Sequence, residues 1–111
     1  MYKKGELILI PYPYTDLSSQ KRRPVLIISN IDRNGDFIAL PVTSKNYHIN
    51  SVPLKGKLLE GSLPKDSWVR TDHIVTLNQS IVVKSFAKTQ TSFVSSMIND
   101  ICIYLDKDSK I

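Results

Sequence analysis

Four apolar residues, Val25–Ile28, stand directly behind three cations and a proline, and this junction constrains the fold more than any other stretch. A short run rich in Val and Ile is typical of a buried β-strand. Pro24 has no amide hydrogen and therefore suits the first position of that strand, which we expect to span Pro24–Asn30. Arg23 would then stand at the mouth of a rigid element, where a guanidinium group can bind phosphate oxygens in pairs. The alternative is a solvated basic loop without a ligand.

Short apolar segments separated by turn residues recur along the chain. The first predicted strand is Glu6–Ile10. Phe37–Thr43 is expected to form a hairpin with the Pro24 strand, because the Asn34-Gly35 pair between them is a strong turn signal. Pro41 indicates a bulge or a sheet edge. Further strand regions are predicted at Ser51–Leu54, at Ser67–Arg70 with His73–Val75, and at Ile81–Phe86. This pattern indicates a mainly β fold, a small barrel or sandwich of short antiparallel strands, with residues 1–111 as one domain.

The hydrophobic period changes from Thr91 onward, where apolar residues recur at three and four positions. This spacing predicts an amphipathic C-terminal α-helix that covers one flank of the sheet. Its apolar residues are Phe93, Val94, Met97, Ile98, Ile101, Cys102 and Leu105. Thr89 or Thr91 is expected to cap the helix. Cys102 lies in the apolar stripe, so we expect it to be a buried small hydrophobe and not a nucleophile.

The charge balance limits the class of partner. A formal net charge of +5 favours nucleic acid, an acidic peptide or a membrane surface. No apolar stretch approaches the roughly 18 residues of a membrane span, and the first is too short for a signal peptide. A single cysteine excludes an internal disulfide and suits a reducing compartment. We therefore expect a cytoplasmic protein. One Cys, two His and no glycine-rich nucleotide loop lead us to expect neither a metal nor a cofactor.

Two side chains of the predicted hairpin are candidates for catalysis. In an antiparallel pair the start of one strand and the end of the next lie at the same end, so we expect Arg23 close to Thr43. A guanidinium and a hydroxyl aimed at one phosphate would stabilise a pentacovalent transition state. With an RNA substrate the 2′-OH is the nucleophile, and no metal is needed. A guanidinium group is a poor general base because it keeps its proton in proteins. We therefore assign Arg23 charge stabilisation and proton donation to the leaving oxygen, and we leave the general base open.

Other polar and aromatic residues keep two interpretations each. Tyr12 and Tyr14 either stack on bases or pack on the barrel. His73 is either a general acid or base, or a surface side chain. Asp72 has either a catalytic or a structural role, such as orienting an arginine. Trp68 belongs either to the core or a dimer interface, or to a base-stacking surface.

Four segments taken together resemble the MazF/PemK family of toxins from prokaryotic toxin–antitoxin systems. They are Gly5–Asp16, Arg22–Ser29, Pro41–Ser44 and Val69–Ile74. The resemblance implies an SH3-like barrel with a C-terminal helix, usually as a homodimer. It implies a metal-independent endoribonuclease that cuts single-stranded RNA at short sequences, an mRNA interferase. It also implies an acidic antitoxin that lies over the RNA groove.

The same resemblance makes Arg23 and Thr43 the catalytic residues. We expect further RNA contacts from Tyr14, Gln20, Lys21, Arg22, Ser44, Lys45 and Asp72. The cut sequence is expected to depend on the loops Tyr12–Gln20 and Lys45–Asn50. Two alternatives remain: a non-enzymatic toxin of this fold that binds a protein target such as DNA gyrase, and an SH3-like adaptor for acidic peptides. The Arg23–Thr43 pair favours the ribonuclease over the non-enzymatic toxin, whereas the adaptor would cause no growth arrest on expression.

Overall fold

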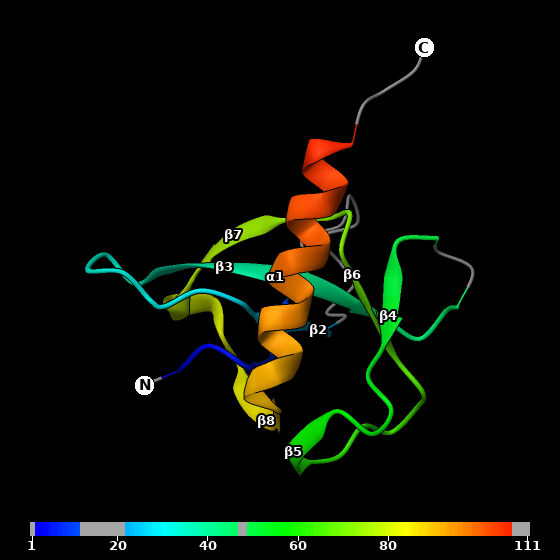
Figure 1. Cartoon of the computed structure of the whole chain (residues 1–111). Coiled ribbons are helices and arrows are strands. Elements are labelled where there is room, and N and C mark those ends of the chain that lie inside the picture. Colours follow the sequence, from blue (N-terminus) through cyan, green and yellow to red (C-terminus); the bar gives the residue numbers. More distant parts are fainter. Residues whose placement is uncertain (1, 12–21, 47–48, 108–111) are drawn as a thin grey trace.

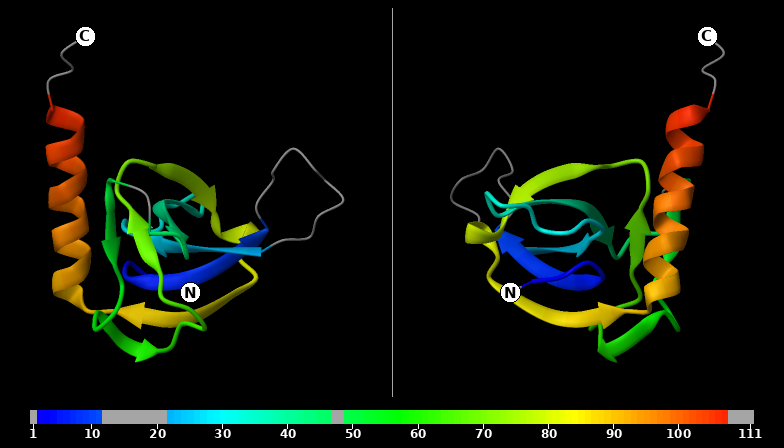
Figure 2. Two further views of the ribbon diagram at one scale, coloured as in Figure 1. Left: turned by 90° about the vertical axis from the view of Figure 1, so that its right-hand side faces the viewer. Right: turned by 60° about the vertical axis from the view of Figure 1, so that its left-hand side comes forward.

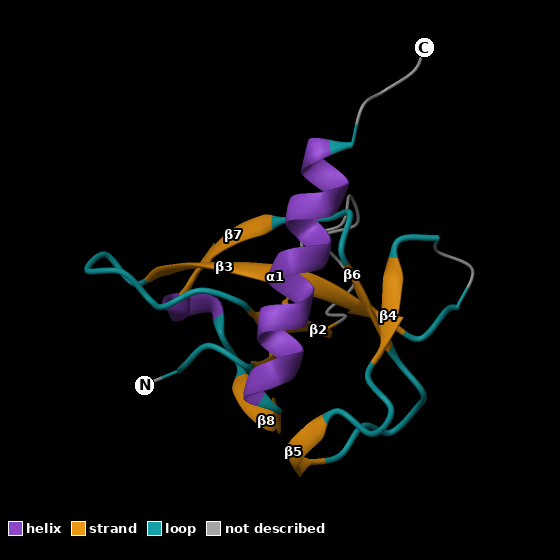
Figure 3. Cartoon of the chain, viewed as in Figure 1, coloured by secondary structure: helices purple, strands orange, loops and turns teal. Residues whose placement is uncertain are grey.

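The computed structural model describes residues 2–11, 22–46 and 49–107 of the chain. Within these ranges the chain forms a curled, half-barrel sheet, and the long helix stands along one side of it (Figures 1 and 2). Figure 3 shows the same elements by type. The strands are β1 (Glu6–Pro11), β2 (Arg22–Ile27), β3 (Asp36–Thr43), β4 (Ser51–Pro53), β5 (Leu58–Gly61), β6 (Trp68–Arg70), β7 (Val75–Asn78) and β8 (Lys84–Thr89). The helices are the 3₁₀ helix η1 (Gln79–Ile81) and α1 (Thr91–Asp106). The predicted mainly β fold with a C-terminal helix is confirmed.

All strand pairs are antiparallel, and the spatial order is β4-β6-β3-β2-β1-β8-β5, with β7 also paired to β3. β3 is an inner strand, so the expected sheet edge at Pro41 is wrong. On the side away from β2, β3 pairs with β7 along Asp36–Ala39 and with β6 along Val42–Thr43. Pro41 lies between these two ladders, where its missing amide hydrogen leaves no ladder bond unmade.

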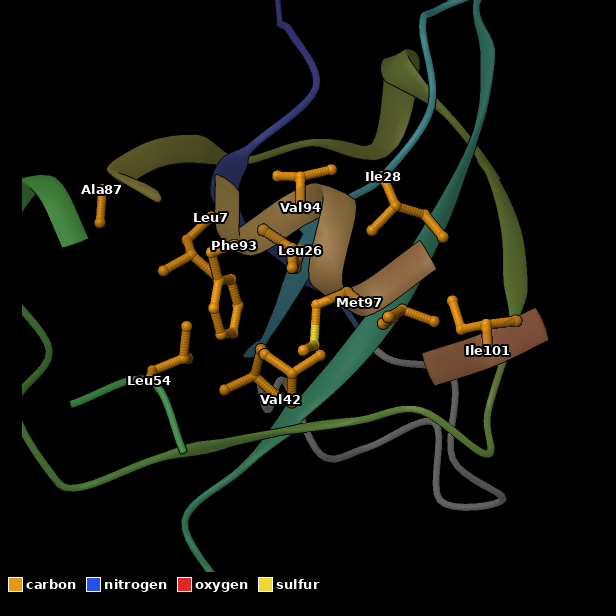
Figure 4. Packing of buried hydrophobic residues seen from close by; sticks show 12 residues of the cluster. Leu7, Leu26, Ile28, Val42, Leu54, Ala87, Phe93, Val94, Met97 and Ile101 are labelled. Atoms are coloured by element: carbon orange, nitrogen blue, oxygen red, sulfur yellow. The ribbon is translucent and has the colours of Figure 1, made fainter. Parts of the chain in front are cut away.

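The central strands are buried on both faces, which explains why their apolar runs do not alternate with polar residues. Leu7, Leu26 and Leu40 face α1 and belong to one cluster with the buried helix residues (Figure 4). Their neighbours in sequence point to the opposite face and pack inside the curl of the sheet. That second cluster contains Ile8, Ile10, Val25, Ile27, Phe37 and Ala39. Two apolar layers therefore hold β1, β2 and β3 rigidly in place.

The helix begins differently from the prediction. Its N-cap is Gln90, which makes no side-chain capping bond, so neither threonine caps it. Thr89 is instead the buried last residue of β8, and its hydroxyl donates to the carbonyl of Gly5 at 2.9 Å. The hydroxyl is thus used to tie the end of β8 to the start of β1. No helix among residues 2–11, 22–46 and 49–107 is long and apolar enough to cross a bilayer.

Only part of the predicted apolar stripe of α1 is buried. The buried residues are Phe93, Val94, Met97 and Ile101. The expectation that Cys102 is buried is wrong, because it follows Ile101 by about 100° around the helix and is exposed. Ile98 and Leu105 are also exposed. The C-terminal half of α1 therefore extends apolar side chains beyond the sheet.

Several strand boundaries differ from the sequence prediction. β2 already begins at Arg22, because Arg22 and Arg23 pair with Pro11 and Ile10 of β1. β7 starts at Val75, two residues after the predicted start at His73. η1 occupies the beginning of the predicted final strand, so β8 starts only at Lys84. No strand was predicted at Leu58–Gly61, but its pairing with β8 makes it one.

Gly61 is pressed against β8, and no other residue type fits there. Its φ is +81°, and a Cβ at this position would lie 2.4 Å from the carbonyl oxygen of Phe86 and 2.7 Å from the Cα of Ala87. Gly56 provides a contrast, since its φ of +76° is equally left-handed but a Cβ would meet nothing within 4 Å. The close approach at Gly61 brings the segment that follows it against the sheet.

We expect Gly61→Ala to lower the free energy of unfolding by about 1–3 kcal/mol more than Gly56→Ala does, because a steric clash adds to the same backbone strain. Urea denaturation of both variants measures the difference. If both variants lost the same free energy of unfolding, β5 could move away from β8 at little energetic cost.

Candidate functional site

The ladder between β2 and β3 includes neither the start of β2 nor the end of β3. Its paired residues run from Val25 opposite Pro41 to Ile27 opposite Ala39. Pro24 and Pro41 carry no amide hydrogen, so neither can donate a bond to continue the ladder. The end of β3 keeps a partner on its other edge, where Thr43 lies opposite Trp68 of β6. The start of β2 and the end of β3 are therefore not joined to each other.

A groove of about 630 Å³ opens at this interruption. The start of β2 and the end of β3 line it together with residues from β1, β8 and the segment that follows Gly61. The lining residues are Leu9, Arg22, Arg23, Pro24, Val42, Thr43, Ser44, Ser62, Leu63, Pro64, Lys65, Ser67, Lys84 and Phe86. Arg23 and Thr43 thus contribute to one groove, from neighbouring strands.

The groove is cationic. Arg22, Arg23, Lys65 and Lys84 line it, and none of the described lining residues is acidic. Cations that face one cavity raise the local potential and concentrate anions there. The partly exposed apolar residues of the groove, among them Leu9 and Phe86, add a surface for a ligand that is not charged throughout. This combination suits a ligand with phosphates and flat apolar parts.

The hydroxyl of Thr43 is held in position by the backbone. Its Oγ1 accepts a hydrogen bond from the amide of Lys45 at 3.1 Å, an i to i+2 contact of the kind that serine and threonine form in turns. An accepted bond leaves the hydroxyl hydrogen to be donated. Thr43 can therefore present an oriented O–H to a bound anion.

Only some of the predicted RNA-binding residues line the groove. Arg22 and Ser44 line the groove beside the predicted catalytic pair. Lys45 does not line it but contacts Thr43 through its amide. Tyr14, Gln20 and Lys21 lie outside the described residues, as do Tyr12 and most of the loop to which it belongs. Trp68 is half-buried on β6, and His73 is exposed.

Asp72 is not among the groove residues; it forms an ion pair with Arg70. The guanidinium Nε and Nη2 donate to the two carboxylate oxygens, each at 3.2 Å. Partial burial disfavours the charged carboxylate, but the hydrogen bonds and positive charge of Arg70 outweigh it and hold the pKa of Asp72 below its ordinary value of 3.8. The structure thus supports the structural interpretation of Asp72, in which it orients an arginine.

The lowered pKa makes the stability of the protein depend on pH. Asp72 contributes stability above the unfolded pKa near 3.8, and this contribution is lost as the pH falls through the lower folded pKa. The two side chains are 23% and 20% exposed, so we expect Asp72→Asn to cost only about 0.5–1 kcal/mol at neutral pH. Urea unfolding of the wild type and of Asp72→Asn, at neutral pH and well below pH 3.8, checks this. The free energies of unfolding of the two proteins should become equal in acid. A difference that persists in acid would contradict the ion-pair origin.

Sequence reasoning missed the second half of the groove. Lys84, Phe86 and the segment Ser62–Ser67 approach the catalytic candidates only because β8 and β5 fold against β1. The one local signal was Leu63, an apolar residue within an otherwise polar loop. It packs against the core cluster beneath α1 and is only partly buried.

Comparison with known proteins gives a family match over nearly the whole chain. Residues 3–105 match the family described as PemK-like, MazF-like toxin of type II toxin–antitoxin system. No curated protein matched the sequence significantly.

Solved structures with the same fold include several toxins. A MazE–MazF complex from Deinococcus radiodurans has a TM-score of 0.71 at 20% identity, covering 96% of this chain and 98% of the other. The toxin MazF-mt6 of Mycobacterium tuberculosis has a TM-score of 0.69 at 18% identity, covering 94% and 99%. An endoribonuclease in complex with its cognate antitoxin, from a mycobacterial species, has a TM-score of 0.68 at 20% identity, covering 99% and 100%. At these identities the likeness concerns the fold.

Proposed function

The chain belongs to the PemK-like and MazF-like toxins of type II toxin–antitoxin systems, and from this premise we propose that it is a metal-independent endoribonuclease that cuts single-stranded RNA at short sequences in the cytoplasm. The observation that carries the proposal is the cationic groove that contains both Arg23 and Thr43. Solved structures of the same fold include one named an endoribonuclease, which supports the same activity.

The proposed reaction needs the substrate, the side chains of this groove and water. The 2′-oxygen of the RNA bonds to the adjacent phosphorus while its proton passes to water, and the bond from phosphorus to the 5′-oxygen breaks. The products are a 2′,3′-cyclic phosphate and a 5′-hydroxyl end. Arg23 stabilises the charge that develops on the phosphorane oxygens and donates a proton to the leaving oxygen, and Thr43 donates its oriented O–H to a non-bridging oxygen. Water later returns a proton to Arg23.

We expect Arg23→Ala to lower the rate of RNA cleavage roughly 100-fold or more, the usual effect of removing a donor at developing charge. The fold should persist, because Arg23 is exposed at the start of β2. Arg33→Ala is the matched control, since Arg33 is an exposed cation in the β2–β3 turn and lies outside the groove. Cleavage of a labelled single-stranded RNA in EDTA measures the rate, and circular dichroism checks that the fold persists. Undiminished cleavage by the Arg23 variant would overturn its assignment.

The nucleophile is tested on the substrate. A single 2′-deoxy nucleotide at the cut site should abolish cleavage there, whereas the same change a few nucleotides away should not. If the wild-type protein cuts no RNA at all, the non-enzymatic alternative, a toxin that binds a protein target such as gyrase, gains support instead.

We also propose an acidic antitoxin as the natural partner. The net charge of +5 and the absence of carboxylates among the described residues of the groove both favour an acidic segment there. Two of the similar structures are named as toxin–antitoxin complexes. An antitoxin bound in this groove would compete with RNA for the same cations.

A second copy of the chain is proposed to cover the apolar surface between β4 and α1. Ile49 is 96% exposed, and Ile103 and Tyr104 of the helix are 60% and 39% exposed. All three line one shallow pocket with residues of β4, which pairs only with β6 among the described strands. An open strand edge next to apolar side chains favours association with another chain.

We expect Ile103→Asp to convert a dimer into a monomer, because a carboxylate would be buried in the interface without a partner. Ser95→Asp adds the same charge at an exposed helix position outside this surface and should leave the dimer intact. Light scattering coupled to size exclusion measures the mass of each. A wild-type monomer at micromolar concentration would refute the dimer.

A further inference from the structure

We propose that the part of the groove formed by Phe86, Leu63, Lys65 and Lys84 binds the nucleotide next to the cut and sets its base preference. The proposal rests on the ribonuclease function proposed above. It moves part of the sequence selectivity away from the loops Tyr12–Gln20 and Lys45–Asn50, where the sequence analysis expected it. We call these four residues the nucleotide subsite.

Phe86 enters the groove because β8 carries a bulge at this residue. The β1–β8 register passes from Leu7 opposite Ala87 to Ile8 opposite Ser85, which leaves Phe86 without a partner on β1. An extra residue of this kind bends a strand and redirects a side chain. Phe86 packs on the core beneath α1 and is half-buried, and it also lines the groove. An aromatic ring is thus anchored on one side and accessible on the other, as base stacking requires.

The opposing residues come from the segment that Gly61 presses against β8. Because Gly61 has no side chain, the backbone can approach Phe86 and Ala87 closely. The chain then turns into Ser62–Ser67, and Ser67 holds this turn by donating its hydroxyl to the carbonyl of Lys65 at 2.9 Å. Leu63 packs on the same core cluster as Phe86 and lines the same groove. Both apolar residues are therefore placed by the fold.

Lys65 and Lys84 bring positive charges to the groove that no described residue neutralises in an ion pair. Neither ammonium group makes a hydrogen bond or ion pair with another residue in the described part of the chain. Both side chains are exposed. Cations that line a cavity whose described lining includes no carboxylate are available for the phosphates on either side of a bound base.

The size and chemistry of the groove favour a nucleotide over an isolated phosphate. Its volume of about 630 Å³ falls within the range of about 300–1,000 Å³ that small-molecule sites have, well above what one phosphate fills. A ring platform, an aliphatic neighbour and two flanking cations match a base with its backbone phosphates. Arg23 and Thr43 lie in the same groove, so the nucleotide bound there is adjacent to the scissile phosphate.

The test compares Phe86→Leu, which keeps an apolar side chain on the core, with Lys84→Ala and with the control Lys57→Ala. Lys57 is an exposed cation outside the groove. Each protein cleaves a pool of single-stranded RNA with randomised sequence, and sequencing of the new ends gives the preference at each position. We expect Phe86→Leu and Lys84→Ala to raise KM at least about fivefold and to flatten the preference at one position beside the cut, with kcat retained. Lys57→Ala should match the wild type.

Binding gives a readout that does not require cleavage. Fluorescence anisotropy with an RNA carrying a 2′-deoxy nucleotide at the cut should show the same loss of affinity for Phe86→Leu and Lys84→Ala. Wild-type preference and affinity in both variants would overturn the subsite while leaving the ribonuclease intact. A wild-type protein that binds this RNA, with loss in both variants, but cuts no RNA would overturn the ribonuclease and retain the subsite. Binding of an acidic peptide but not of RNA would overturn both.

Discussion

The candidate site depends on two prolines that end one ladder. Pro41 lies opposite Val25 in the last pair of the β2–β3 ladder, and Pro24 comes directly before Val25; neither proline has an amide hydrogen to donate. Beyond this point β3 pairs with β6 on its other edge and no longer with β2. The released strand ends carry the residues best suited to bind a phosphate, Arg23 and Thr43.

The rigidity of the site comes from burial on both faces of the central strands. The two apolar clusters clamp β1, β2 and β3 from opposite sides, so the ends of these strands project from a fixed base. The same arrangement supplies the far side of the groove, because β8 pairs with β1 and Gly61 presses β5 onto β8. A site built on strand ends and one tight glycine contact is positioned more accurately than one built on long loops.

Charge is distributed unequally over this framework. The described residues that line the groove include cations and no carboxylate, whereas the ion pair between Arg70 and Asp72 lies outside this lining. Exposed apolar side chains gather elsewhere, since Ile49 and the C-terminal half of α1 expose apolar residues that do not line the cationic groove. One surface thus suits an anionic ligand, and the other suits a second protein surface.

The sequence alone determined the fold class, the β2–β3 hairpin, the helix and the approach of Arg23 to Thr43. These follow from local signals: continuous Val and Ile runs, an Asn-Gly turn, and a three-to-four-residue period. Only the tertiary structure decided that β3 changes partners at Pro41, that Phe86 sits in a bulge, and that Leu58–Gly61 is a strand. It also decided that Cys102 is exposed, because the face of α1 that packs on the sheet is centred on other residues and Cys102 lies about 100° around the helix from the buried Ile101. Such features depend on which strands meet and how far each extends, and contacts between distant residues leave no periodic mark in the sequence.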